Sequence, residues 1–235
     1  MNFKTTLLRL SLPCIFALLA TLARATEVPN TASPLDTLRK AAEEGDRTAS
    51  FNLGMSYFSG ENGVQDFGEA VKWFETAADQ GSEDACINLG FFYDTGIGVE
   101  QNYLQAAKWY TMAAEKGNAT AQFNLGILYD FGKGVEQDYA EAAKWYTLAA
   151  KQGCVGAQYN LGNLYLTGHG VEQNLVTAEM WYLLAAAYDH AESKRQHDIL
   201  VQKLTPEEFE QAYESACKIG ANLFASVDDS TRHNG

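Results

Sequence analysis

Basic residues are scarce in this sequence. Its 235 residues include 17 Lys and Arg against 30 Asp and Glu, which gives a formal net charge of −13 at pH 7. A surface of that sign repels phosphate backbones, so the composition argues against a nucleic-acid partner. A charged partner would more easily be a basic protein or peptide. The same excess of acidic residues also serves solubility by itself.

Cysteine is rare as well, and neither the four cysteines nor the four histidines fall at the spacing of a metal motif. The sequence therefore predicts no metal and no cofactor. Apart from Cys14, three cysteines remain, Cys86, Cys154 and Cys217. Because that number is odd, at least one thiol is unpaired or pairs between molecules. Cys86 is expected to be a buried thiol. A bridge between the other two would require the last helix to fold back, which the sequence leaves open.

Apolar runs long enough to span a membrane are lacking. The run Leu10–Leu22 follows two basic residues and precedes Ala23-Arg24-Ala25. It is too short for a membrane-spanning helix and is typical of a secretory signal. We therefore expect a signal peptide at residues 1–25, export to the periplasm or medium, and no stable membrane insertion after cleavage. Residues 26–34 are polar and contain proline, which predicts a flexible leader.

Repetition is what the chain has in abundance. A Leu-Gly pair and a tryptophan each recur every 36 residues, and a period in this range is typical of a stacked repeat array. The recurring residues fall at helical spacing, so two helices per period are predicted. The glycines of the first helices are Gly54, Gly90, Gly126 and Gly162, and the tryptophans of the second helices are Trp73, Trp109, Trp145 and Trp181.

A glycine inside a helix costs about 1 kcal/mol against alanine, so its recurrence needs a compensating gain. We expect a close approach of the neighbouring helix that a β-carbon would block. The tryptophans, and the tyrosines that follow the Leu-Gly pairs, are expected to be core residues. Paired glycines in the loops are expected to end the first helices with positive φ, and Asn or Asp to cap the second helices.

The period sets the predicted boundaries. The full repeats are expected at residues 46–81, 82–117, 118–153 and 154–189. A capping half repeat is predicted at 35–45 and capping helices at 190–224, of which 190–203 would be a degenerate first helix with a polar outer face. Thr205-Pro206-Glu207-Glu208 has the pattern of a capping box and predicts a helix to about Ile219. Residues 225–235 are expected to form a disordered tail.

The stretch from Ala121 to Ala150, with its Ala-Gln-Phe-Asn-Leu-Gly, Gly-x-Gly-Val and Ala-x-x-Trp-Tyr-x-x-Ala-Ala phrases, resembles the Sel1-like repeat. This is the 36-residue relative of the tetratricopeptide repeat. The resemblance implies an all-α fold, a right-handed α-solenoid of antiparallel helix pairs whose first helices line a concave surface. It also implies a non-catalytic adaptor or scaffold that binds a protein or peptide, in bacteria often exported and involved in envelope signalling or host contact.

Asparagine precedes each Leu-Gly pair, although it is a poor residue for a helix interior. We predict that this column contacts the partner, together with nearby aromatic and acidic residues that favour an extended segment of basic character. The candidates are Asn52, Asn88, Asn124, Asn160, Phe91, Asp94 and Asp130. Phe92 and Phe131 are further candidate surface anchors. The competing interpretation is structural, with each asparagine bonded to backbone of the adjacent helix or loop.

A catalytic alternative rests on Ser215 and Lys218, which form a Ser-x-x-Lys motif on the predicted capping helix. Some cysteine-rich relatives of the resembled family are linked to β-lactam binding, so an envelope hydrolase or β-lactam-binding protein is the alternative function. The companion motifs Ser-Asp-Asn and Lys-Thr-Gly are absent from the sequence, and we therefore predict that the protein is not an enzyme. A third interpretation is a subunit of a larger assembly whose solenoid ends stack.

Overall fold

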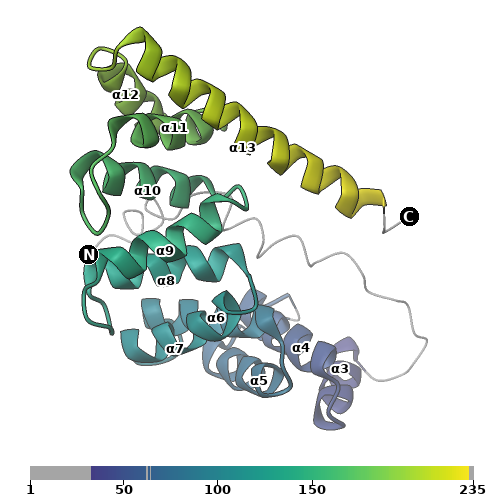
Figure 1. Ribbon diagram of the computed structural model, residues 1–235. Helices are drawn as coiled ribbons and strands as arrows, with labels where there is room; N and C mark the ends of the chain where they lie inside the picture. The colour runs from purple at the N-terminus through teal and green to yellow at the C-terminus, as the bar shows by residue number, and fades with distance from the viewer. Residues whose placement is uncertain (1–32, 62, 64, 233–235) are drawn as a thin grey trace. The chain divides into compact units, whose positions relative to one another are not determined.

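The computed structural model describes residues 33–61, 63 and 65–232, with side chains to Leu223, and in these ranges every regular element is a helix (Figure 1). The predicted signal peptide and residues 26–32 of the predicted leader lie outside these ranges. The helices are α3 (Pro34–Glu43), α4 (Arg47–Ser59), α5 (Phe67–Asp79), α6 (Glu83–Thr95), α7 (Tyr103–Ala114), α8 (Ala119–Phe131), α9 (Tyr139–Ala150), α10 (Val155–Thr167), α11 (Leu175–Ala186), α12 (Ala191–Leu200) and α13 (Pro206–Arg232).

The chain divides into two compact units. In the first, described from residue 33 to residue 137, α3 packs on α4, α4 on α5, α5 on α6, α6 on α7 and α7 on α8. In the second, described from residue 138 to residue 232, α9 packs on α10 and α10 on α11, and α11 contacts both α12 and α13. Up to α12, each helix thus packs on its neighbour in sequence within its unit, and α13 packs on α11, which confirms the predicted two helices per 36-residue period.

Helix ends are set by the residues that the sequence predicts. The first helices α4, α6, α8 and α10 end at glycines with φ between 64° and 77°, in the left-handed region that glycine adopts without strain. The second helices α5, α7, α9 and α11 begin after Asp66, Asn102, Asp138 and Asn174, whose side chains accept hydrogen bonds from first-turn amides. The capping predictions for these helices are therefore confirmed.

The helix-interior glycines make room for aromatic rings. A β-carbon on Gly54 would lie 2.8 Å from the ring of Phe74, and one on Gly162 would lie 2.7 Å from the ring of Tyr182. Both rings are fully buried. The predicted close approach is thus confirmed, but the group that a β-carbon would meet first is the side chain that follows each tryptophan. Trp109 and Trp181 are buried, whereas Trp73 and Trp145 are only half-buried, so the prediction of core tryptophans was correct for two of the four.

A glutamine closes each loop between the two helices of a repeat. Its side-chain amide donates to the backbone carbonyl seven residues earlier, near the end of the first helix. The donor–acceptor pairs are Gln65 to Phe58, Gln101 to Asp94, Gln137 to Asp130 and Gln173 to Leu166, at 2.6 to 3.0 Å. The carbonyl is thus satisfied by a side chain of the same repeat.

The C-terminal capping box forms as predicted. The backbone amide of Thr205 donates to Glu208 Oε2 at 2.8 Å, and the amide of Glu208 donates to Thr205 Oγ1 at 3.2 Å. The helix that it starts continues to Arg232, so the predicted end at about Ile219 was wrong.

Two features explain the longer helix α13. Gly220 keeps a right-handed helical conformation instead of ending the helix. Leu223 lies at the turn before α10, where its Cδ2 is 3.7 Å from the position of a β-carbon on Gly153.

The outer face of α12 also differs from the prediction, since Ile199 is 48% exposed and the following Val201 is 42% exposed. This capping face is therefore partly apolar.

Candidate partner-binding face

The asparagine column lies on the first helices, but its four members are not equivalent. Asn52 is exposed, and Asn124 and Asn160 are half-buried, so these three keep surface that a partner can reach. Asn88 is 5% exposed, and its side-chain amide donates to the backbone carbonyl of Asp84 at 2.8 Å. Bonding to the carbonyl four residues earlier is the structural role of the competing interpretation. Asn88 is therefore the weakest of the four as a contact residue.

Phenylalanine rings gather in the first unit around α4, α5 and α6. Phe92 is 1% exposed and lies 5.6 to 6.4 Å from the ring centroids of four other phenylalanines, Phe58, Phe67, Phe74 and Phe91. The prediction of Phe92 as a surface anchor was wrong, because the ring belongs to this aromatic core. Phe91 is half-buried at the edge of the cluster, so part of its ring is available to a partner.

The two acidic candidates, Asp94 and Asp130, lie near the ends of α6 and α8 and are both half-buried. Burial raises the pKa of the Asp94 carboxyl, and the nearby charge of Lys133 acts in the opposite direction. The backbone carbonyls of both residues accept the loop-closing glutamine bonds. The backbone position of each carboxylate is therefore fixed by its own loop, which suits a preformed contact surface.

An exposed patch that sequence reasoning largely missed lies beside Asp94. We call it the Phe131 patch, made of Tyr103, Leu104, Phe131 and Lys133. The Lys133 ammonium lies 5.2 Å from the ring centroid of Tyr103 and 5.9 Å from that of Phe131. Leu104 and Phe131 are 64% and 63% exposed, the highest values among the exposed large hydrophobic side chains of the described region. Phe131 was a predicted anchor, and the structure leaves it accessible.

The sequence signals this patch when the repeats are aligned and residues 36 positions apart, which form one column of that alignment, are compared. Positions 36 residues before and after Phe131 hold Thr95 and Thr167, whose hydroxyls donate to carbonyls of their own helices. The neighbours of Leu104 in its column are the small or β-branched Gly68, Ala140 and Val176. Large apolar groups at these two positions depart from the repeat pattern and do not fill the core. Comparing columns for departures would have found both residues.

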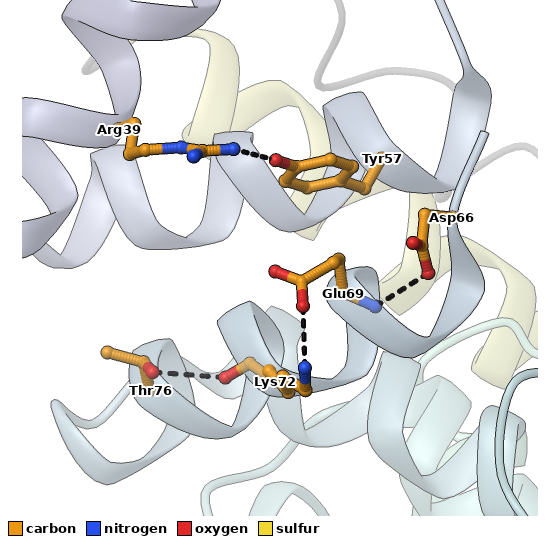
Figure 2. A network of polar contacts seen from close by, with 6 residues as sticks. All are labelled: Arg39, Tyr57, Asp66, Glu69, Lys72 and Thr76. Atoms are coloured by element: carbon orange, nitrogen blue, oxygen red, sulfur yellow. Dashed lines mark hydrogen bonds and ion pairs between the residues drawn. The ribbon is translucent and has the colours of Figure 1, made fainter. Parts of the chain in front are cut away.

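The tyrosines of the first helices hold their hydroxyls at the edges of the core, as predicted for this column. Tyr57 is buried, and its hydroxyl accepts a hydrogen bond from Arg39 of the capping helix α3 (Figure 2). Tyr93 donates to Glu75 at 3.0 Å, and burial together with that bond raises the pKa of Tyr93. The same figure shows Lys72 paired with Glu69 at 2.6 Å on the exposed side of α5. These contacts support packing and solubility rather than chemistry.

The residues of the catalytic alternative lie on α13 without forming a reactive pair. The Ser215 hydroxyl donates to the carbonyl of Gln211 at 2.8 Å, and the Lys218 side chain is exposed. Among the described side chains, no group of three or more His, Cys, Asp or Glu is arranged to hold a metal ion. Within the same part of the chain, none of the helices combines the length and the hydropathy needed to cross a membrane.

The three cysteines of the described region form no disulfide bonds. Cys86 is buried, as predicted, and burial raises the pKa of its thiol. Cys154 is half-buried and Cys217 is exposed. The bridge between Cys154 and Cys217, which the sequence left open, is not formed in the structure.

Comparison with known proteins identifies the repeat. The Sel1 repeat model matches residues 48–82, 83–118, 119–154 and 155–189. A protective antigen present in uropathogenic Escherichia coli strains, which displays an SLR fold, is 38% identical with a TM-score of 0.71 over 80% of this chain and 42% of the antigen. This chain thus spans less than half of the antigen's length.

A Sel1 repeat protein from Oxalobacter formigenes is 32% identical, with a TM-score of 0.64 over 77% of this chain and 75% of that one. No curated protein matches. The family model covers 48–189, more than half of the chain, and the helix pairs of the structure follow the same period. The all-α fold, a solenoid of Sel1-like repeats, is thereby confirmed, and the chain belongs to the Sel1 repeat family.

Proposed function

We propose that this protein is an exported, non-catalytic adaptor that binds a protein or peptide partner through the first-helix face and the adjoining Phe131 patch. Sel1 repeat proteins generally act as protein-interaction scaffolds, which supports the class of function. The observation that carries the proposal is that Leu104 and Phe131 are both left about two-thirds exposed, with Lys133 over the Phe131 ring and over the ring of Tyr103, which precedes Leu104. Exposed apolar side chains grouped with an aromatic ring are typical of binding hot spots.

A basic partner fits the electrostatics. The chain carries 30 acidic residues against 17 basic ones, and Asp94 and Asp130 lie on the candidate face. Opposite charge on the partner would speed association, and this electrostatic attraction would weaken as salt is added. A role in envelope signalling or host contact is proposed by analogy, since one similar structure is that of a protective antigen of uropathogenic Escherichia coli. Export rests on the signal-like residues 1–25 and is part of the proposal.

Affinity capture with residues 26–235 from an envelope fraction, followed by quantitative binding of each captured protein, tests this function. The test variant combines Leu104→Ala and Phe131→Thr, which place at each position a residue found in the same column. Leu148→Ala is the matched control, because Leu148 is an exposed apolar side chain outside the patch. We expect the double variant to lose about tenfold or more in affinity, since hot-spot side chains each contribute about 1 kcal/mol or more.

The control should bind as the wild type does, and circular dichroism melts of all three proteins should coincide. Equal binding by the wild type and the double variant would remove the Phe131 patch from the interface. Asn124→Ala tests the asparagine column separately, since Asn124 is half-buried and reachable. Asn88→Ala is unsuitable because its buried amide is bonded within α6. Mass spectrometry of the exported protein should find Thr26 at the N-terminus.

A further inference from the structure

A buried acidic residue joins the last repeat to the C-terminal cap. Glu179 of α11 is 0% exposed, and its Oε1 forms a hydrogen bond with Nδ1 of His197 of α12. Its second oxygen, Oε2, is buried and has no hydrogen-bond partner in the described region. The His197 side chain is 28% exposed, so the pair connects the core to the surface. A buried carboxyl group with one satisfied oxygen depends on its single hydrogen-bond partner.

The pair stands at two positions that hold buried apolar residues in the preceding repeats. Positions 36, 72 and 108 residues before Glu179 hold Ala143, Ala107 and Val71, and those before His197 hold Leu161, Leu125 and Leu89. All six are buried. The change is coordinated, because both sides of the column become ionisable at the same step, where α12 packs on α11. Packing alone would have been served by alanine and leucine, as it is in the preceding repeats.

The protonation state of this pair should therefore control how firmly the cap is held. Burial raises the pKa of Glu179, and the bond and charge of His197 oppose that rise. A carboxyl with a raised pKa contributes stability that is fully present below its ordinary pKa and is lost as the pH rises through the folded-state value. The contact therefore weakens as the pH rises through that value.

Neighbouring groups leave this dependence in place. Tyr182 on α11 interacts electrostatically with Glu179, and Tyr159 on α10 interacts with Tyr182. Other ionisable groups on α12, on the turn before it and at the start of α13 are Lys194 with Asp189, Arg195 with Glu192, and Glu208. The lysine, the arginine and Glu208 are engaged with partners other than Glu179. From α13, the ring of Phe209 lies 6.1 Å from that of His197. His190 caps α12, and burial lowers its pKa, so it stabilises the cap in the opposite direction, as the pH rises.

We propose that Glu179 and His197 form a proton-controlled latch that holds α12 and the first turns of α13 on α11 in mildly acidic solution and loosens them as the pH rises. The latch lies over a small apolar cluster in which Leu200 of α12 packs with Ala178 and Tyr182 of α11, with Leu204 at its edge. Opening would uncover the α11 end of this cluster, the surface on which the next helix pair of a repeat array stacks. The last step of the stack thus becomes conditional on pH, whereas the preceding steps are fixed by apolar contacts.

Hydrogen exchange of the whole protein, corrected for the intrinsic rate at each pH, tests the latch between pH 5.5 and 8.0. In the wild type, the opening constant of the α12 amides should rise with pH by up to about tenfold per pH unit, the limit for one linked proton. Glu179→Gln keeps an acceptor for His197 without the charge, so its α12 opening should lack this rise. The double variant E179A/H197L copies the Ala143 and Leu161 pair of the preceding repeat and should lack it too. The opening constants of the α10 amides, measured in the same samples, serve as the internal reference.

Parallel pH profiles of α12 in the wild type and the Glu179→Gln variant would overturn the proposal, since the charge of Glu179 would then not control the cap. His190→Asn retains a capping side chain without a titrating group, so repeating the comparison in that background separates the His190 contribution. If the double variant fails to fold, the Glu179→Gln comparison still decides. A rise in α12 opening with pH that survives in both variants would assign the dependence to another group.

Discussion

Replacing Gly162 by alanine is the sharpest test of how the repeats pack. A β-carbon at this position would lie 2.7 Å from Cε1 and 2.9 Å from Cδ1 of Tyr182, whereas ordinary contact begins at 3.4 Å. The ring would have to withdraw by about 0.7 Å, the difference between 3.4 and 2.7 Å. Tyr182 is 0% exposed and its hydroxyl donates to Asn163 at 2.7 Å, so it has no free space to move into without weakening that bond.

The expected loss follows from two opposing terms. Overpacking a filled core costs about 1 to 3 kcal/mol, and the fixed ring places this site at the upper end. Alanine in a helix interior recovers about 1 kcal/mol of backbone entropy over glycine. The net prediction for Gly162→Ala is a loss of about 2 kcal/mol in the free energy of unfolding, which lowers Tm by several degrees in a chain of this size.

Gly220→Ala in α13 is the matched control. A β-carbon there would lie 3.8 Å from Leu184 Cδ2, an ordinary contact, so only the entropy gain applies. We expect this control to stabilise the protein by about 0.5 to 1 kcal/mol. Urea unfolding followed by circular dichroism at 222 nm measures both variants. If Gly162→Ala were as stable as the control, the ring of Tyr182 would not be what requires glycine at this position.

Two further predictions concern the cap and the thiols. Thr205→Ala removes the acceptor of the Glu208 amide and should cost about 1 kcal/mol of unfolding free energy. Thr205→Ser should cost little because it retains the hydroxyl. Equal urea midpoints for the two variants would argue against the capping box. A disulfide reagent should modify exposed Cys217 quickly and buried Cys86 only on unfolding, because burial both shields the Cys86 thiol and raises its pKa. Peptide mapping resolves the two sites. Fast modification of Cys86 in the native protein would contradict its burial.

Most of the fold could be read from the sequence because the repeat presents each rule several times. Helix number, the glycine stops, the Asn and Asp caps and the capping box all follow from local chemistry, and the structure confirms them. The length of α13 could not be read, because the polar residues of the stretch 225–235 suggest an ending. The contacts that continue the helix, Leu223 at the turn by Gly153 and Leu184 beside Gly220, depend on where the helix lies.

The candidate site was less predictable, since residues at the same position of successive repeats can differ in burial. Asn52 and Asn88 occupy the same position of the repeat, yet one is exposed and the other is buried and bonded to Asp84. Sequence reasoning weighted what recurs, whereas the Phe131 patch and the Glu179–His197 pair arise where a column changes residue type. A departure from the column is visible in the sequence, but whether its side chain is exposed or buried requires the structure.

The loop-closing glutamines bear on how such a chain can gain or lose length. Each bond joins two groups of one repeat, so a duplicated 36-residue segment would carry its own closure with it. The first loop holds its glycine and valine one position later than the others, yet Gln65 still bonds Phe58. A one-position shift of residues within a loop is thus tolerated as long as the loop keeps its length. New copies inserted before Glu179 would meet neighbours of their own kind, whereas a copy inserted between Glu179 and His197 would separate Glu179 from its hydrogen-bond partner.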